Sequence, residues 1–599
     1  LNIDTLSIVS NNTAGNFGGG YYISKNSTVE IANTRFNNNT AQQGGAIYNL
    51  GTITVPTMKV ANYYITNFNN NTANSTDLDA LGGAIYNNGT IENLWGGRYN
   101  AGQINNNVAT SVNGAAKGGA IYNIGTITNF RDDNDKYIYW LEVSNNKAHS
   151  ENAEALGGGI YNNSVLNYMP SVLDNNKAIS DNSYAAGGGL YNDVNGVITD
   201  SWTHMQNNYA LGNSGANGAS MGGGVYNAGT ITNLDFRYTS ADSDRPRLNY
   251  AQDTSGSAFG GAIYNSGTIS KIYATSSGNT NHTSFFKQNY AYGYVNAGGG
   301  AIYNTGKINE IRAHYDGNYA IATTGNAMGG AIYNSGTINS TYYWTSNWDD
   351  GGYNNYVQAN DGYAMGGLIY NTGTISSIQT GRYRLNRAIG KYAYGGAIYN
   401  TGNLTIYTSL LNNWANGSTD AKGGAIYSSG NIKLIVNSGY IREISGNYTQ
   451  IGSGSKIYSA IYMADATKTL TIQSTGGGIW KIADTIEGVT GYTTRITGDN
   501  GSYVHFNNAS SQIKGSNVIF DTITMSFTKN TFADSNTILR ANSGNLIFAS
   551  SNVSNYIINN LQSTEQVRYA FKINSSSTTI KADRLDVGAG SSGTVFIDN

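Results

Sequence analysis

Short apolar runs alternate with polar residues along most of this chain, and one such run recurs almost unchanged. It reads GGAIYNLGTI at residues 44–53, GGAIYNNGTI at residues 82–91 and GGAIYNIGTI at residues 118–127. The segments GAIYN and GTI are short, contain β-branched or aromatic residues, and are bounded by Gly and Asn, which is typical of β-strands. The pattern therefore predicts a repeated pair of short strands.

A second element, an apolar residue followed by two variable positions and asparagine, precedes most copies of the first. It occurs at residues 36–39, 68–71, 104–107, 173–176 and 286–289. The tyrosines of neighbouring GAIYN copies are 26 to 39 residues apart, a period that indicates a solenoid with one coil per repeat. We expect three strands per coil, one at this second element and one each at GAIYN and GTI. Leucine-rich repeats and propellers have similar periods, but this chain lacks the leucine spacing of the first and the four strands per blade of the second.

Stacked coils would place identical residues of successive repeats beside one another, about 4.8 Å apart. The aliphatic residue of GAIYN is expected to form an interior column, and the following asparagine a structural ladder whose side-chain amides satisfy one another. The Asn-x-Gly corner that follows is expected to use left-handed backbone. The predicted ladder comprises Asn49, Asn87, Asn123, Asn162 and Asn265.

The tyrosine of GAIYN alternates with the aliphatic residue, so it is expected on the opposite face of the strand. Stacked outward tyrosines could bind glycans or a neighbouring molecule through their aromatic faces, or could lie under loops and serve packing alone. Both interpretations stay open from the sequence. The candidate ladder comprises Tyr48, Tyr86, Tyr122, Tyr264, Tyr303 and Tyr333. Five tryptophans are candidates either for carbohydrate contact or for anchoring an insertion: Trp95, Trp202, Trp344, Trp348 and Trp414.

The GGAIYN motif stops near residue 465, but alternating segments such as LTIQ, NVIF, ITMSF and NLIFA continue. We expect residues 1–465 to form the repeat β-helix. Residues 466–599 are expected to form an irregular β-helical continuation that precedes a C-terminal anchor outside this chain. The chain begins at Leu1 without the features of an export signal, so we expect a mature form or a fragment.

Composition narrows the function classes. Charged residues make up 12% of the chain and the net charge is −2, so a nucleic-acid partner is not expected. The chain has no cysteine, which excludes disulfides and thiolate metal sites and is compatible with export through a periplasm. No apolar run approaches the roughly 18 residues of a membrane helix, so we expect no direct membrane span.

Catalysis on a β-helix would require clustered carboxylates, with or without calcium and a Lys or Arg base. Acidic residues cluster only in variable insertions, where solvated loop charges are the simpler interpretation. The histidines show no metal-ligand spacing. We predict no catalytic residue, no cofactor and no metal site. The acidic clusters are Asp132, Asp133 and Asp135, then Asp242 and Asp244, then Asp349 and Asp350; the histidines are His149, His204, His282, His314 and His505.

The alternation of GGAI with Phe-x-x-Asn resembles the repeats of the chlamydial polymorphic membrane proteins and related autotransporter passengers. Residues 44–47 together with 36–39, and residues 82–85 together with 68–71, carry the resemblance, which spans about residues 15–465. It implies an all-β, right-handed, single-stranded parallel β-helix that is exported to the bacterial cell surface, often as an adhesin, with an outer-membrane anchor. The second element departs from that pattern where it has another apolar residue in place of Phe, and the absence of cysteine also differs from many members.

We therefore expect a secreted, non-enzymatic protein of the bacterial cell surface that acts as an adhesin or as a self-associating structural passenger. Its partner would be a host or bacterial surface glycan or protein, or further copies of itself. One alternative is a building block of an extracellular filament or surface layer, assembled through open β edges. A second alternative is a polysaccharide lyase or hydrolase, which would need a groove with convergent carboxylates.

Overall fold

Strand pairing joins the same motif of neighbouring repeats. In the computed structural model, the GAIYN strands pair in parallel and in register, so that Ile85 lies opposite Ile121 and Tyr86 opposite Tyr122. Successive strands follow one another around a right-handed parallel β-helix, and the described residues contain no helix. The fold class predicted from the repeat is confirmed.

The chain divides into two compact units, Leu1–Ile338 and Asn339–Asn599. The change in pattern expected after residue 465 is a different boundary and stays a prediction. The structure describes residues 6–31, 33–54, 66–94, 102–129, 141–170, 172–238, 246–276, 279–282, 284–342, 350–379, 381–499, 501–508, 511–528, 537–548, 555–558, 561–563, 566–570, 573–574, 581–582, 584–587 and 592–593.

One coil of the first unit shows how the motifs become strands. β13 (Gly102–Asn105) comes from the apolar-x-x-Asn element, β16 (Ile121–Asn123) from GAIYN, and β17 (Thr126–Asn129) from GTI. Between the first two lie β14 (Val108–Ser111) and β15 (Ala116–Lys117), where the sequence predicted no strand. Each coil therefore has four sides, and the expectation of three strands per coil is wrong on this point. We call the additional side, built from β14, β15 and their equivalents, the wing. The strands equivalent to β14 form its first line and those equivalent to β15 its second line.

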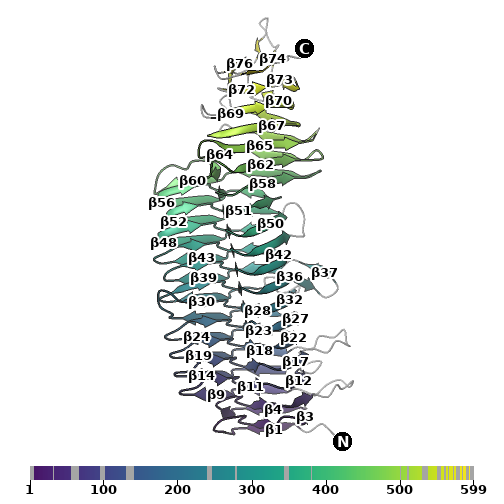
Figure 1. The fold of residues 1–599 in the computed structure, drawn as a ribbon, viewed down its shortest axis with the longest axis vertical. Helices are drawn as coiled ribbons and strands as arrows, with labels where there is room; N and C mark the ends of the chain where they lie inside the picture. The colour runs from purple at the N-terminus through teal and green to yellow at the C-terminus, as the bar shows by residue number, and fades with distance from the viewer. Residues whose placement is uncertain are drawn as a thin grey trace. The chain divides into compact units, whose positions relative to one another are not determined.

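The same four sides recur along the first unit, and Figure 1 shows β9, β14, β19 and β24 of the wing lying one above another. The first side contains β1 (Ser7–Ser10), β4 (Thr34–Asn37), β8 (Asn67–Asn69), β13, β18 (Leu141–Ser144), β23 (Val172–Asp174) and β28 (His204–Gln206). The first line of the wing contains β5 (Thr40–Ala41), β9 (Thr72–Ser75), β14, β19 (Lys147–Ser150), β24 (Lys177–Ser180), β29 (Tyr209–Gly212), β33 (Tyr250–Asp253), β39 (Tyr290–Gly293) and β43 (Tyr319–Ala322). Its second line contains β10 (Ala80–Leu81), β15, β20 (Ala155–Leu156), β25 (Ala185–Ala186), β30 (Ala219–Met221), β34 (Ser257–Phe259), β40 (Ala297–Gly298) and β44 (Ala327–Met328).

The tyrosine side of the first unit is built from the GAIYN strands, and the fourth side from the GTI strands. The tyrosine side contains β2 (Tyr21–Ile23), β6 (Ile47–Asn49), β11 (Ile85–Asn87), β16, β21 (Ile160–Asn162), β26 (Leu190–Asn192), β31 (Val225–Asn227), β35 (Ile263–Asn265), β41 (Ile302–Asn304) and β45 (Ile332–Asn334). The fourth side contains β3 (Thr28–Glu30), β7 (Thr52–Thr54), β12 (Thr90–Asn93), β17, β22 (Val165–Tyr168), β27 (Val197–Asp200), β32 (Thr230–Tyr238), β36 (Thr268–Ser276) and β42 (Lys307–Asp316).

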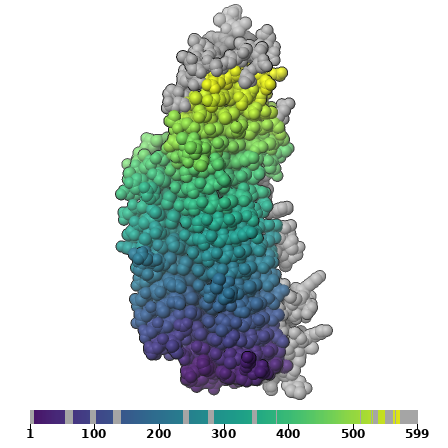
Figure 2. Space-filling view, in the orientation of Figure 1, coloured from purple at the N-terminus to yellow at the C-terminus, as the bar shows by residue number. Residues whose placement is uncertain are grey.

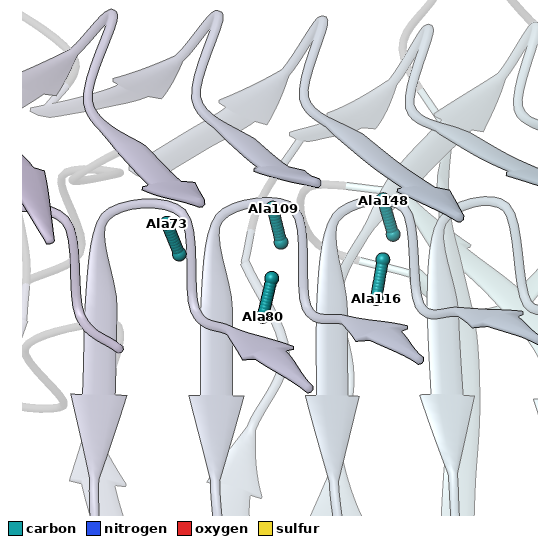
Figure 3. Close-up of a cluster of buried hydrophobic side chains, with 5 residues drawn as sticks. All are labelled: Ala73, Ala80, Ala109, Ala116 and Ala148. Atoms are coloured by element: carbon teal, nitrogen blue, oxygen red, sulfur yellow. The ribbon is translucent and has the colours of Figure 1, made fainter. Parts of the chain in front are cut away.

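The two lines of the wing face each other across alanine side chains. Figure 3 shows Ala73, Ala109 and Ala148 of the first line directed toward Ala80 and Ala116 of the second. All five are fully buried. Two β-layers this close leave room for a methyl group and little more, so a larger side chain would force them apart. This explains the alanine that recurs two residues after the asparagine of the second element.

The interior of the coils is filled by one apolar column from each side. Ile47, Ile85 and Ile121 of the tyrosine side are fully buried, and Phe36 stacks on Phe68 of the first side with ring centroids 4.8 Å apart. Burial of an aliphatic or aromatic side chain stabilises the fold by about 1.5–3 kcal/mol. Side chains of neighbouring coils meet without gaps across the face of the first unit that Figure 2 shows.

The second unit keeps the four-sided coil in its first part. Its wing contains β48 (Tyr356–Met365), β52 (Arg387–Tyr394), β56 (Trp414–Lys422) and β60 (Tyr448–Ile451), and its tyrosine side contains β49 (Ile369–Asn371), β53 (Ile398–Asn400), β57 (Ile426–Ser428), β61 (Ser459–Met463) and β64 (Thr485–Gly488). After β64, the longer strands that the structure describes pair on two sides, and a single parallel bridge joins Ile486 of β64 to Ile513. One side carries β63 (Ile479–Ile482), β66 (Tyr503–Phe506), β68 (Ile523–Phe527) and β70 (Gly544–Phe548); the other carries β62 (Thr469–Ser474), β65 (Tyr492–Gly498), β67 (Ser516–Asp521) and β69 (Ile538–Ala541).

Left-handed backbone occurs at corners other than the one predicted. It lies at the residue before the asparagine of the second element, for example Asn70 (φ 58°) and Asn106 (φ 58°), and at the first glycine of the GG pair, such as Gly82 (φ 66°). Gly89 of the Asn-x-Gly corner does not have positive φ, so that prediction is wrong. This corner excludes a side chain for another reason, because a Cβ on Gly89 would lie 2.1 Å from the carbonyl oxygen of Gly51.

The second glycine of the GG pair provides a test of how closely the coils approach. A Cβ on Gly83 would lie 2.0 Å from the carbonyl oxygen of Gly119 and 2.6 Å from the carbonyl carbon of Val108, whereas one on Gly15 would meet nothing within 4 Å. We expect Gly83→Ala to lower the free energy of unfolding by at least about 2 kcal/mol, and Gly15→Ala to leave it nearly unchanged. Urea denaturation, together with hydrogen exchange at the amides of residues 85–87, measures both. Equal stability of the two variants would contradict the close stacking.

Candidate functional site

The tyrosines of the GAIYN motif form one continuous stack in the first unit. Ring centroids of neighbours lie 4.0 to 5.5 Å apart, and their planes agree within 21°. The six tyrosines singled out in the sequence all belong to this column. Its members are Tyr22, Tyr48, Tyr86, Tyr122, Tyr161, Tyr191, Tyr226, Tyr264, Tyr303 and Tyr333. In the second unit, Tyr370, Tyr399, Tyr427 and Tyr462 repeat the arrangement.

This column points away from the isoleucine core, but it lies against the second line of the wing. Leu156 and Ala186 of that line pack with Tyr161 and Tyr191 in one buried cluster. Farther along, the ring of Phe259 lies 4.6 Å from that of Tyr303. Tyr86, Tyr161 and Tyr191 are only 6 to 9% exposed. The column therefore fills a second packed layer in the corner between wing and tyrosine side, and is not a freely exposed ridge.

The stacking leaves ring edges and hydroxyl groups, rather than ring faces, for contact with a partner. Within the column each face lies on the ring of the neighbouring coil, so a sugar cannot lie flat on it as glycan recognition through aromatic faces would require. Burial, together with the nearby carboxylates of Asp79 and Asp193, raises the pKa of the Tyr122 phenol to about 12. The Tyr161 hydroxyl donates to the Asp193 carboxylate at 2.5 Å. The exposed chemistry of the column is thus that of neutral phenols.

The asparagine of GAIYN forms a buried amide ladder along the first unit. Each Nδ2 donates to the Oδ1 of the next coil at 2.7 to 2.8 Å, and each asparagine is fully buried. The five asparagines singled out in the sequence lie in this ladder. It comprises Asn49, Asn87, Asn123, Asn162, Asn192, Asn227, Asn265, Asn304 and Asn334. Because an amide both donates and accepts, one residue type satisfies itself throughout the column.

A second buried ladder, not predicted from the sequence, is built from the asparagine of the second element. Asn39 donates through its backbone N–H and its Nδ2 to Oδ1 of Asn71, each at 3.0 Å, and Asn71 Nδ2 donates in turn to the carbonyl oxygen of Phe36 at 2.9 Å. The same bonds recur at Asn107, Asn146, Asn176, Asn208, Asn249, Asn289 and Asn318. The signal was the constant position of this asparagine after an apolar residue.

An equivalent asparagine ladder in the second unit runs through Asn355, Asn386, Asn413 and Asn447, and Asp484 accepts the hydrogen bond of its last member. Its Oδ2 accepts from the backbone N–H and the Nδ2 of Asn447 at 2.8 and 2.9 Å. Burial raises the pKa of the Asp484 carboxyl to about 6, although these hydrogen bonds and one from the Gly446 N–H lower it in part.

A further column, also not predicted, lies on the outer face of the wing. It is formed by the residue that directly follows each asparagine of the second ladder. In the first unit, Tyr209, Tyr250, Tyr290 and Tyr319 stack at 4.7 to 5.0 Å, and the Lys177 ammonium lies 5.2 Å from the Tyr209 ring. In the second unit the equivalent positions hold Tyr356, Arg387, Trp414 and Tyr448. The residue type at this position changes from repeat to repeat, so comparing the repeats in the sequence did not reveal the column.

The remaining candidates are scattered. Trp95, Trp344, Trp348, Asp132, Asp133, Asp135, Asp242, Asp244 and Asp349 lie outside the described residues, as do the side chains of Asp350 and His282. His149 lies against Asp181 and His204 against Asp174, each pair on neighbouring coils. Among the side chains that the structure describes, no group of three or more His, Asp and Glu could hold a metal ion. That part of the chain also has no helix long and apolar enough to cross a membrane.

Two replacements of Tyr161 distinguish the contribution of the ring to stability from that of the hydroxyl. Tyr161→Phe keeps the ring between Tyr122 and Tyr191 but removes the bond to Asp193, and should cost about 1 kcal/mol. Tyr161→Ala opens the stack and should cost about 3 kcal/mol or more. Urea denaturation gives the two values, and near-ultraviolet circular dichroism reports the ring stack. Equal losses would mean that the stacked ring itself does not contribute.

Replacement of Asp484 by asparagine should remove a pH-dependent cost. Because the folded-state pKa is raised from 3.8 to about 6, folding favours the protonated acid. Stability is therefore greatest below the unfolded pKa and falls by about 3 kcal/mol as the pH rises through the folded one. We expect Asp484→Asn to raise the urea midpoint at pH 8 and to flatten its slope between these two pKa values. The exposed Asp361→Asn is the matched control, and an unchanged slope in Asp484→Asn would refute the assignment.

Residues 33–50 match the model of the Chlamydia polymorphic membrane protein repeat. The matched segment contains β4, β5 and β6 and includes Phe36, Asn39 and the first GGAIYN copy. No curated protein and no solved structure matches the chain. The match supports a surface passenger with repeats of the polymorphic membrane protein type.

Proposed function

We propose that this chain is a non-catalytic surface passenger, an adhesin or self-associating structural protein, that works by presenting one surface many times over. The observation that carries the proposal is the repetition of outward side chains in register. On the wing of the first unit, four tyrosines follow one another at 4.7 to 5.0 Å. The match of residues 33–50 to a repeat of surface proteins supports the same conclusion.

Repetition has a direct consequence for binding. A partner that contacts one coil weakly meets the same contact on the next coil at high effective concentration, so weak contacts combine into useful avidity. The phenol edges and the carbon surfaces between them carry no formal charge, which favours glycans and proteins over nucleic acid. With a net charge of −2 the chain supplies little long-range attraction for a polyanionic helix.

Self-association is the second form of this proposal. A repeated flat face is complementary to any partner whose contacts recur at the spacing of the coils. Another copy of this chain necessarily has the same spacing. Such contacts would be lateral, between wings or between fourth sides, and would not require free strand edges. Passengers on one cell surface would then bind passengers on another.

The test combines electron microscopy of the purified chain with binding to an array of glycans and surface proteins, and with a polysaccharide depolymerisation assay. Single particles that capture a glycan or protein, without turnover, are expected for an adhesin; concentration-dependent lateral pairs are expected for self-association. Ordered end-to-end polymers in the absence of ligand would move the assignment to a filament component. Release of new reducing ends or unsaturated sugars would overturn the non-catalytic proposal.

A further inference from the structure

The wing of the second unit carries a cation inside its aromatic column. Arg387 pairs in register with Tyr356 on one coil and with Trp414 on the next. Its guanidinium carbon lies 4.4 Å from the centroid of the Tyr356 ring and 5.6 Å from that of Trp414. The planar cation therefore takes the place that a tyrosine ring holds in the column of the first unit.

The column continues to a second cation. Trp414 stacks on Tyr448 with centroids 5.9 Å apart and planes within 2°, and the Lys456 ammonium lies 4.3 Å from the centre of the Tyr448 ring. Arg387 and Tyr448 are two coils apart, about 10 Å along the helix axis. Two positive groups thus flank a pair of aromatic rings.

Neither cation is neutralised within the described part of the chain. Arg387 donates one hydrogen bond, from Nη1 to Asn354 Oδ1 at 2.5 Å. Its Nε and Nη2 groups have no acceptor there, and no carboxylate lies within ion-pair distance of Arg387 or of Lys456 among the residues that the structure describes. Lys422 on the same wing provides the contrast, since its ammonium lies 2.9 Å from the Asp420 carboxylate.

Burial makes this arrangement costly without an anion. Arg387 is half-buried between the rings, and burial lowers its pKa from the ordinary value of the guanidinium group. The two rings also fix its plane, so its free N–H groups keep one direction. A fixed guanidinium edge fits the two oxygens of a carboxylate or sulfate, and charge-assisted bonds of this kind are about twice as strong as neutral ones.

We propose that Arg387, with Lys456 and the edges of Trp414 and Tyr448, forms a binding site for an acidic glycan. The guanidinium receives a carboxylate or sulfate group of the sugar through paired N–H bonds. The ring edges pack against the sugar carbons, and Lys456 attracts a second anionic group about one disaccharide away. This inference rests on the proposed adhesive function and names the chemical class of its ligand.

A purely structural role for Arg387 makes a different prediction. If the guanidinium served only to continue the stack, its replacement would change stability but not affinity for an anion. Lysine in its place retains the charge and loses the planar fork. Methionine retains much of the apolar contact and loses the charge. These variants therefore separate packing, charge and geometry.

The experiment measures binding of the full chain to heparin, which is sulfated, to polygalacturonate, which is carboxylated, and to uncharged dextran, at low and high salt. Wild type is expected to bind at least one acidic polymer and not dextran. Arg387→Met should weaken that binding about tenfold or more, Arg387→Lys should lose most of the same affinity, and Lys456→Met should lose a smaller part. Arg495→Met, which removes an exposed charge elsewhere in the unit, should bind as wild type does.

Loss of equal size in Arg495→Met would attribute binding to net charge and overturn the site, as would unchanged affinity in Arg387→Met. Circular dichroism and thermal melting check that each variant folds. If Arg387→Met does not fold, the exposed Lys456→Met decides, and full affinity in that variant refutes the site. Failure of wild type to bind either acidic polymer, with retained capture of another glycan or protein, overturns the site but leaves the adhesive function standing. Failure to capture any partner or to self-associate overturns both.

Discussion

The register that places each residue opposite its counterpart in the next repeat is the constraint on which this structure depends. It favours side chains that tolerate their own kind at the spacing of one coil. Isoleucine does so by packing, tyrosine by stacking, and asparagine by donating to the Oδ1 of the next asparagine while accepting from the previous one. A long column of carboxylates or ammonium groups would repel itself, and the two paired lysines, Lys147 and Lys177, stand between Val108 and Tyr209. The low share of charged residues, 12%, follows from this rule.

The same rule decided what the sequence could predict. Residues that recur without change, such as Ile85 and Asn87, predicted the strand, its inward column and its amide ladder. The wing was missed because its strands are short and because its alanines, for example Ala109 and Ala116, lie on either side of a variable turn. A period of two residues cannot be recognised in a strand as short as the two-residue β15 of the second line.

One question that the sequence left open and one misplaced corner also have physical causes. The tyrosine column lies opposite the isoleucine core, as alternation requires, but alternation carries no information about the wing that packs on it. The left-handed corners were placed at the Asn-x-Gly sequence because both residues favour that conformation. In the structure, Asn70 and its equivalents adopt it instead, because the chain turns there between the first side and the wing.

These results change where binding chemistry is expected in a repeat protein of this kind. Within a uniform column every side chain is satisfied by its neighbours, so the column offers a partner only edges. Groups that can still bind a partner remain where a column changes residue type. Asp484 ends an asparagine ladder and has no amide to donate onward, and Arg387 interrupts an aromatic column with a charge that its ring neighbours contact but do not neutralise. In a repeat protein, then, invariant residues report the fold, and single departures from the repeat are the positions at which specific recognition can be built.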